Sequence, residues 1–303
     1  MTVTAARIPS VLHARPAFEG ANIRTWIGFK HFMYLVEGAV LQYCRDQGTG
    51  AARLFHDFGR GLEILDCSVQ LPAVLELDDE VRAQVTAGAG NRLDVQLSVA
   101  RGGEDVTVLR GKVVVALLPE ASAPGHKDVP GPLAALQAEA FPAAEPLRLR
   151  PWENAESVLR GQGGLLWSWL ARYTLCHYSD RVQHSAYVRA LEEVVDRYLN
   201  QQGISVGRML RERDWIPVVS RARVRLLAPA HMEETIHTVF TVTDILRDVM
   251  FDARMDCYVQ RGQQLIPVAT AKILHGYAIA AGPGAGGMAE LDAEVLAALR
   301  GVS

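Results

Sequence analysis

The chain has 303 residues, of which 49% are hydrophobic and 21% are charged, and its formal net charge is -3. This length accommodates about two domains of ordinary size, which bury a core without disulfide or metal staples. A charge this close to zero provides no whole-protein attraction to nucleic acid or to an anionic membrane, so we expect neither as a partner.

Compartment and cofactor use are predicted from the N-terminal residues and the cysteines. The first 17 residues lack the continuous apolar segment of a secretory signal. The sequence contains no run of about 18 uncharged apolar residues, so we expect no membrane span. The cysteines are scattered and form no CxxC pair, at Cys44, Cys67, Cys176 and Cys257. We therefore expect a cytoplasmic protein with reduced cysteines and no metal site.

In chain order, the first half begins with a short apolar segment. Its sequence pattern then predicts two helices followed by strands. The long helix is predicted over 28–48, where apolar residues recur every three or four positions and Gly48 suits the C-terminal end. A shorter helical segment covers 50–61. Period-two alternation of β-branched residues then predicts strands over 62–73, 80–88, 92–100 and 106–118.

The next stretch, 119–153, is rich in Pro and Ala and predicts a linker, with a short helix at 132–140. It separates two halves of similar size. We therefore predict an N-terminal domain over 1–118, a linker over 119–153, a C-terminal domain over 154–281 and a tail over 282–303. In the tail, the sequence predicts a Gly-rich turn and a last short helix. We assign no role to the tail.

The second half repeats the order of the first. A long helix is predicted over 184–203, a shorter segment over 205–215, and strands over 218–230, 235–245, 249–260 and 265–280. Placing Gly48 against Gly203 also brings Glu37 onto Glu192 and Tyr43 onto Tyr198.

The fold class that follows is α+β, with two antiparallel sheets that each wrap a long central helix. Two such sheets joined edge to edge would cover each other's exposed edge strands. We therefore predict a fused double unit, a pseudo-dimer in one polypeptide.

One group of residues in the second half carries a family resemblance. The turn Tyr178-Ser179-Asp180 is followed by 182–188, VQHSAYV, and by the acidic pair Glu192-Glu193 on the predicted helix. Downstream segments at 216–219, 228–230 and 268–271 complete the pattern. The region 165–280 resembles the acyl-CoA thioesterases of the hotdog superfamily, in particular the 4-hydroxybenzoyl-CoA thioesterase and YbgC-like branch, and the first half is a weaker copy.

The resemblance implies a double hotdog that hydrolyses an acyl-CoA or acyl-carrier-protein thioester. Coenzyme A or phosphopantetheine would then be part of the substrate, with no separate cofactor. The pattern departs from the family in its turn, which is short and keeps one Asp, at position 180, close to His184.

Thioester hydrolysis requires a polarised carbonyl and an activated water or nucleophile. The helix N-terminus near His184 and Ser185 would polarise the carbonyl. Asp180 is the candidate carboxylate, Tyr178 and His184 would orient the substrate, and His184 could also act as a general base. Structural alternatives stay open: Asp180 as a helix or turn cap, His184 as an inert surface or packed histidine, and Tyr178 as a packing residue. Glu192 is the reserve carboxylate, because we expect Glu193 to pair with Arg197.

The first half lacks an Asp between Asn22 and His31, so we expect one working site. His31 and Glu37 are the first-half residues that we expect to contribute to that site across the pseudo-dimer interface. Arg221 and Arg223 alternate on one strand face with Arg225, where they would meet phosphates of coenzyme A or of a carrier. A solvated strand face is the alternative for these arginines.

Three other functions remain open at this point. Double-hotdog dehydratases carry a His-x-x-x-Gly-x-x-x-x-Pro motif, which this sequence lacks. Acyl transfer uses the same carbonyl activation with another acceptor, and a non-catalytic acyl-binding protein is compatible with the shortened turn. By analogy with duplicated stand-alone enzymes, we expect a role in polyketide or fatty-acyl specialised metabolism and possible assembly into a homodimer of double hotdogs.

Overall fold

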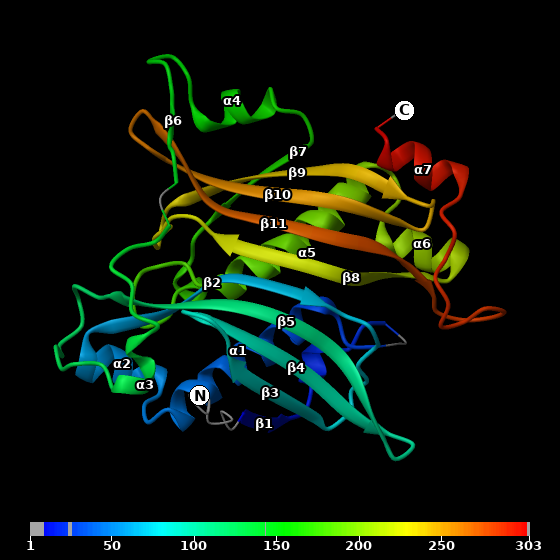
Figure 1. The fold of residues 1–303 in the computed structure, drawn as a ribbon. Coiled ribbons are helices and arrows are strands. Elements are labelled where there is room, and N and C mark those ends of the chain that lie inside the picture. Colours follow the sequence, from blue (N-terminus) through cyan, green and yellow to red (C-terminus); the bar gives the residue numbers. More distant parts are fainter. Residues whose placement is uncertain (1–8, 24–25, 143, 302–303) are drawn as a thin grey trace. The chain divides into compact units, whose positions relative to one another are not determined.

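The computed structural model describes residues 9–23, 26–142 and 144–301 (Figure 1). The chain divides into two compact units, unit 1 over Met1–Phe141 and unit 2 over Pro142–Ser303. This division falls inside 119–153, the stretch whose composition predicts a linker. In the described ranges, no helix is long and apolar enough to cross a membrane.

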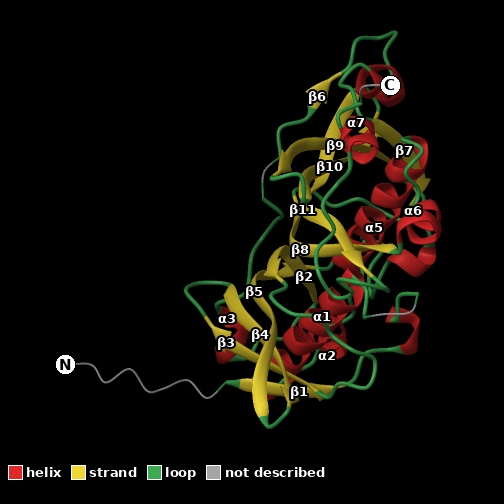
Figure 2. Ribbon diagram, turned by 90° about the vertical axis from the view of Figure 1, so that its right-hand side faces the viewer, coloured by secondary structure: helices red, strands yellow, loops and turns green. Residues whose placement is uncertain are grey.

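Unit 1 consists of a long helix, short helices and an antiparallel sheet with the strand order β1-β3-β4-β5-β2. In chain order its elements are β1 (Ser10–Ala14), η1 (Phe18–Gly20), α1 (Phe29–Asp46), α2 (Ala51–Phe58), β2 (Arg60–Gln70), β3 (Val81–Ala87), β4 (Arg92–Arg101), β5 (Glu104–Pro119) and α3 (Gly131–Ala134). Helix α1 covers one face of this sheet (Figure 2).

The core of unit 1 lies between α1 and the sheet. Phe32, Val36 and Val40 recur every four residues along α1 and are almost fully buried. On β4, buried residues alternate with partly or fully exposed Arg92, Asp94 and Gln96. Burying each large apolar side chain contributes roughly 1.5–3 kcal/mol, so the two periodicities fix which face of each element turns inward.

Unit 2 has a similar construction, with the strand order β8-β11-β10-β9-β7 and a short strand β6 paired to β11. Its elements are β6 (Leu147–Arg148), α4 (Ala155–Arg160), β7 (Leu165–Leu170), η2 (Tyr173–Leu175), α5 (His184–Gln201), α6 (Val206–Arg213), β8 (Trp215–Leu226), β9 (Thr235–Leu246), β10 (Met250–Arg261), β11 (Gln264–Ile279) and α7 (Ala293–Leu299). The predicted α+β class is confirmed in both units.

The two units repeat each other almost residue for residue. Helices α5 and α6 begin and end 155 residues after α1 and α2, and η2 follows η1 by the same interval. Strand β11 begins and ends 160 residues after β5. The register predicted from Gly48 and Gly203 is therefore the register of the helices, and the later strands follow it with a shift of five residues.

Unit 2 differs in what covers the sheet face away from α5. Neighbouring residues on a strand point to opposite faces, and Phe240 packs on Tyr198 of α5 with ring centroids 5.3 Å apart. Val239 points the other way and forms a cluster with Ala155 and Leu159 of α4. The segment that carries α4 therefore closes part of the outer face of unit 2.

The helix predicted at 132–140 is shorter in the structure, where α3 ends at Ala134. Beyond it, the Leu117 N–H donates to the Leu136 carbonyl at 2.8 Å, and the Ala138 N–H donates to the Leu117 carbonyl at 3.2 Å. Gln137 thus forms an isolated parallel bridge with Leu117 of β5, because the strand offers backbone partners that a continued helix would not use. The last short helix predicted in the tail is present as α7.

Candidate functional site

The turn that precedes α5 is held in place by backbone hydrogen bonds. Cys176 and Val182 form an antiparallel bridge that closes it. The Gln183 N–H donates to the Leu175 carbonyl at 3.0 Å, and the Val182 N–H donates to the Ala230 carbonyl at 2.8 Å. The turn is thereby attached to the loop between β8 and β9, and its tip carries Asp180.

Asp180 lies beside a histidine that the sequence analysis did not select. Its Oδ1 is 3.1 Å from Nδ1 of His231, with 61% of the Asp180 side chain and 37% of the His231 side chain exposed. The Asp180 carbonyl also accepts a hydrogen bond from the Met232 N–H at 2.8 Å. The structure therefore presents a solvent-accessible carboxylate whose orientation is set by an imidazole.

The loop that carries His231 is held by hydrogen bonds from Arg261, which we call the clamp. Arg261 donates to both carboxylate oxygens of Glu234, at 2.6 and 2.9 Å, and to the Pro229 carbonyl at 2.8 Å. Glu234 also accepts the His231 N–H at 2.8 Å. Burial raises the pKa of Glu234, but the hydrogen bonds from Arg261 and His231 outweigh burial and lower this pKa below its ordinary value.

The same clamp exists in unit 1. Arg101 pairs with Asp79 and donates to the Val74 carbonyl at 3.1 Å. The Glu76 N–H donates to Asp79 at 2.8 Å, as the His231 N–H does to Glu234. Because the clamp occurs in both units, we interpret it as a structural feature that stabilises the loop. In unit 2 this loop positions His231.

The N-terminus of α5 brings three polar residues into a buried position. Gln183, His184 and Ser185 are 8%, 6% and 5% exposed. Gln183 is the N-cap residue but makes no side-chain capping hydrogen bond. Within the described part of the chain, its buried Oε1 has no hydrogen-bond partner. The positive end of the helix dipole and a buried amide therefore occur together, next to the turn of Asp180.

The other residues predicted for the site in unit 2 lie at varying distances from this turn. Tyr178 is on the turn and 53% exposed. Glu192 is half-buried on α5, eight residues after His184, which corresponds to about 12 Å along the helix axis. The expected pair of Glu193 with Arg197 is confirmed, at 2.7 Å.

Arg221 and Arg223 lie on β8 and are exposed, with Ala222 and Val224 buried between them. They point to the sheet face away from α5, so the structure does not place them at the N-terminus of that helix. His31 belongs to unit 1, where it is 4% exposed and contacts the Tyr34 ring with centroids 5.2 Å apart. A role for these three residues in substrate binding stays a prediction.

Unit 1 lacks the Asp-His pair. Counting back 155 residues leads from His231 to Glu76, which is exposed, and from Asp180 to Thr25, which lies outside the described residues. The N-cap residue of α1 is Gly28, and the helix begins with Phe29 and Lys30. The expected loss of the first-half carboxylate agrees with this register.

The site offers a carboxylate, an imidazole, a buried amide and a helix N-terminus, which together suit acid-base chemistry on a carbonyl compound. Across the described ranges, no group of three or more His, Cys, Asp or Glu side chains is placed to hold a metal ion. His231 was missed because it is 51 residues from Asp180 in sequence; the only signal was its position directly after the Ala228-Pro229-Ala230 corner.

Comparison with known proteins agrees with this description. Residues 169–299 match the family model of the thioesterase-like superfamily. No curated protein matches the sequence. The family match includes the turn with Asp180, α5 and the loop with His231.

Solved structures of the same fold cover both units. A putative oleoyl thioesterase from Lactobacillus plantarum is 10% identical with a TM-score of 0.59, covering 90% of this chain and 97% of that chain. An acyl-ACP thioesterase from Bacteroides thetaiotaomicron is 10% identical with a TM-score of 0.57, covering 88% and 97%. The 12:0-ACP thioesterase from Umbellularia californica is 12% identical with a TM-score of 0.57, covering 88% and 94%. The resemblance to hotdog thioesterases is confirmed.

Proposed function

We propose that this chain hydrolyses an acyl thioester and that the reaction takes place at the N-terminus of α5, with Asp180 as the catalytic carboxylate. The observation that carries the proposal is the Asp180–His231 pair at 3.1 Å, inside the region that matches the thioesterase-like superfamily. The structural relatives named as acyl-ACP thioesterases support a thioester-bound acyl group as the substrate, which we propose to be carried by an acyl-carrier protein or by coenzyme A.

The proposed mechanism assigns one task to each group. Backbone N–H groups at the start of α5, near His184 and Ser185, polarise the thioester carbonyl and stabilise the oxyanion that develops on it. Asp180 either activates a water molecule or attacks the carbonyl carbon. Water then supplies the hydroxyl of the released acid, and the thiolate of coenzyme A or of the carrier leaves and takes up a proton.

His231 and Gln183 have supporting roles in this proposal. The imidazole of His231 holds the Asp180 carboxylate in one orientation through the contact at 3.1 Å. The buried Oε1 of Gln183, which has no hydrogen-bond partner among the described residues, accepts a hydrogen bond from the attacking water in this proposal. His184 and Tyr178 line the approach, with Glu192 as the reserve carboxylate.

We also propose that the two units pair edge to edge as a pseudo-dimer. Within unit 1, β2 is hydrogen-bonded to β5 on one side, and within unit 2, β8 is hydrogen-bonded to β11 on one side. Pairing would cover the remaining strand edges. Small-angle scattering tests this: a compact 303-residue chain has a radius of gyration of about 19 Å, and separately moving units would give a clearly larger value.

The activity is tested by release of free thiol from a panel of acyl-CoAs and acyl-carrier proteins, with wild type beside Asp180→Asn. We expect turnover by the wild type and a loss of about a hundredfold or more in the variant. Turnover that survives the substitution would remove Asp180 from the mechanism. Release that occurs only when an acceptor is added would identify acyl transfer, and binding without any release would identify an acyl-binding protein.

The acyl group and the pathway follow from the same panel. Polyketide or fatty-acyl intermediates of specialised metabolism are the substrates that we propose, and a cytoplasmic location is proposed with them. A preference for carrier-bound over coenzyme A-bound substrate by about tenfold would correspond to 1.4 kcal/mol of additional binding to the carrier.

A further inference from the structure

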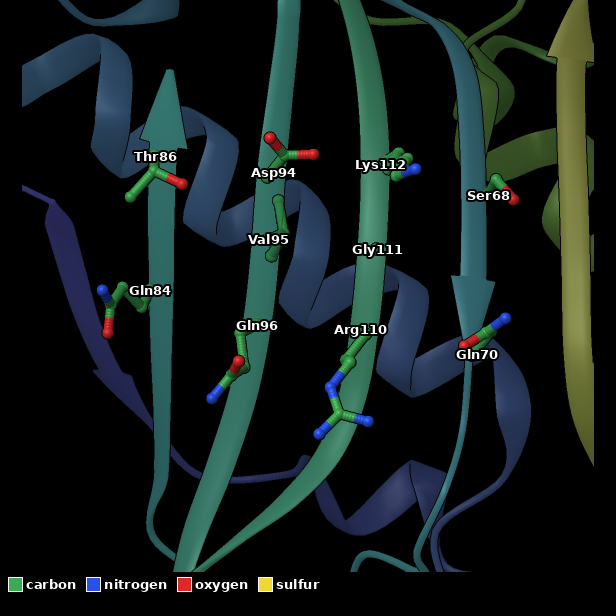
Figure 3. Close-up of a pocket in the computed structure, with 10 residues that line it drawn as sticks. All are labelled: Ser68, Gln70, Gln84, Thr86, Asp94, Val95, Gln96, Arg110, Gly111 and Lys112. Atoms are coloured by element: carbon green, nitrogen blue, oxygen red, sulfur yellow. The ribbon is translucent and has the colours of Figure 1, made fainter. Parts of the chain in front are cut away.

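The outer face of the unit 1 sheet is hollowed into a groove that the proposed thioesterase site does not use. The groove has a volume of about 610 Å³ and extends across β2, β3, β4 and β5, on the side of the sheet away from α1 (Figure 3). Small-molecule sites commonly have volumes of roughly 300–1,000 Å³, so the groove has the size of a ligand site.

Two cationic side chains lie in the groove without a partner among the described residues. Arg110 and Lys112 are exposed on β5, and neither makes a hydrogen bond or an ion pair there. They are two positions apart on one strand, so their side chains rise from the same face about 7 Å apart. Among the lining residues, Asp94 carries the only carboxylate, and it pairs with Arg92 at 3.7 Å. The groove therefore carries an excess of positive charge.

Three glutamines lie in one row across the sheet with Arg110: Gln84 on β3, Gln96 on β4 and Gln70 on β2 (Figure 3). Arg82 donates to Oε1 of Gln84 at 2.9 Å, which leaves the amide N–H groups of Gln84 as donors toward other partners. Amides together with the Asp94 carboxylate can both donate to and accept from hydroxyl groups. No aromatic ring lines the groove, so it offers no stacking surface for a base.

The corresponding face of unit 2 is occupied by its own contacts. Thr270 stands at the position of Arg110 and donates to Asp256 at 2.8 Å, and Asp256 also pairs with Arg254 at 2.7 Å. Val239, at the position of Gln84, is buried in the cluster with α4. The same face of unit 2 also carries exposed cations, Arg223, Arg225 and Lys272, but its described strands have no row of glutamines, so the amide-lined groove is a property of unit 1.

We propose that this groove binds a hydroxyl-rich organic phosphate, the chemistry shared by nucleotides and sugar phosphates. Arg110 and Lys112 bind the phosphate oxygens, for which guanidinium and ammonium groups are suited. Gln96 and Gln70, which flank Arg110 in the ladder, and Asp94, which stands opposite Lys112, bind the sugar hydroxyls. The inference does not rest on the thioesterase proposal, because none of these residues belongs to unit 2.

Isothermal titration calorimetry of the full chain tests the proposal, with ADP, ribose 5-phosphate, ribose and inorganic phosphate as separate probes at low salt. We expect at least one of the two organic phosphates to bind and inorganic phosphate to bind at least about tenfold more weakly. Binding should weaken as salt screens the exposed cations. Binding of ADP alone identifies a nucleotide ligand, and equal binding of ribose 5-phosphate identifies the sugar phosphate as the recognised part.

The double variant Arg110→Ala/Lys112→Ala should lower the affinity by at least about tenfold, through loss of the charge-assisted contacts. Gln96→Glu should also weaken binding, because it adds a negative charge beside the phosphate. The matched control is Arg53→Ala/Arg160→Ala, which removes the same charge from exposed positions on α2 and α4 and should keep the affinity. Thermal melts verify that all variants fold.

Three results would overturn the proposal. The first is affinity for ADP and ribose 5-phosphate that is unchanged in the double variant. The second is inorganic phosphate binding as tightly as the organic phosphates, which would mean an adventitious ion only. The third is the absence of heat and of any shift in melting temperature with every phosphate probe.

Discussion

Units 1 and 2 share the long helix, the short helix after it and five paired strands in matching order, yet their chemistry differs. In unit 2 the turn before the long helix carries Asp180, and the following loop carries His231. Unit 1 has Thr25 and Glu76 at these positions, and it has the open groove with Arg110 and Lys112. The Arg-carboxylate clamp occurs in both units. The clamp shared by the repeats thus supports the fold, whereas the Asp-His pair and the glutamine-lined groove, each found in one unit, are the candidates for function.

The largest expected effect comes from giving unit 2 the turn residue of unit 1. Asp180→Thr should lower kcat/KM for thioester hydrolysis by about a hundredfold to ten-thousandfold, the range of a lost acid-base group. The control Thr25→Val alters the same register position in unit 1 and should change kcat/KM by less than about twofold. Steady-state thiol release measures both. Equal losses in the two variants would mean that the units do not differ in catalysis.

A second difference concerns acid stability. His275 in unit 2 is 3% exposed, and burial lowers its pKa to about 4; the position 160 residues earlier is Val115. Below pH 6.5 this histidine is therefore protonated in the unfolded chain but not in the folded chain. As the pH falls from about 6.5 to 4, the free energy of unfolding decreases by about 3 kcal/mol.

His275→Val should remove this contribution to the pH dependence. Urea unfolding at pH 7 and pH 4.5 gives the free energy of unfolding lost on acidification. This loss should be smaller in the variant than in the wild type. The result that would contradict the prediction is an equal loss in both proteins, which would assign the acid sensitivity to other groups.

The third prediction concerns the residue after each short helix. Gly59 and Asp214 occupy equivalent positions with φ of 63° and 54°. A Cβ on Gly59 would lie 2.4 Å from the Gly125 carbonyl oxygen, so only Gly fits in unit 1. Gly59→Asp should lower the free energy of unfolding by about 2 kcal/mol or more, whereas Asp214→Gly should change it by less than about 1 kcal/mol. Chemical denaturation of both variants measures the two changes in the free energy of unfolding. Changes of similar size would contradict the prediction.

The smallest effect is expected at Tyr277. It is fully buried, and its hydroxyl has no hydrogen-bond partner among the described residues; burial raises the pKa of this hydroxyl. Leu117 stands at the equivalent position of unit 1. Tyr277→Phe should therefore raise the free energy of unfolding by about 1 kcal/mol, because the cost of burying an unpaired hydroxyl is removed. A loss of stability, seen as a lower melting temperature, would show that the hydroxyl is satisfied by ordered water.

Much of the fold was predictable because it depends on local periodicity. The predicted long helices, 28–48 and 184–203, differ from α1 and α5 by at most two residues at either end. The duplication was visible because Gly48 and Gly203 end both helices in the same register. The helix predicted at 132–140 failed at its C-terminal half because pairing with β5 outweighs a weak local preference.

The candidate site was predictable in part. The turn with Asp180, directly before the long helix, is identified by a local motif that resembles the hotdog thioesterases. His231 was not found, because nothing in the loop sequence indicates that it lies 3.1 Å from a carboxylate 51 residues earlier. Arg221 and Arg223 were recognised as one strand face, but the sequence did not specify that this face points away from α5.

The sequence by itself therefore determined the elements, their repetition and the turn that carries the candidate carboxylate, because the periods of helix and strand and the helix-ending glycines are local properties. The tertiary structure decided the partner of Asp180, the shared clamp and the groove with Arg110 and Lys112. Each of these joins side chains from different elements, and their proximity depends on strand order and register, which are set by the packing of the whole unit.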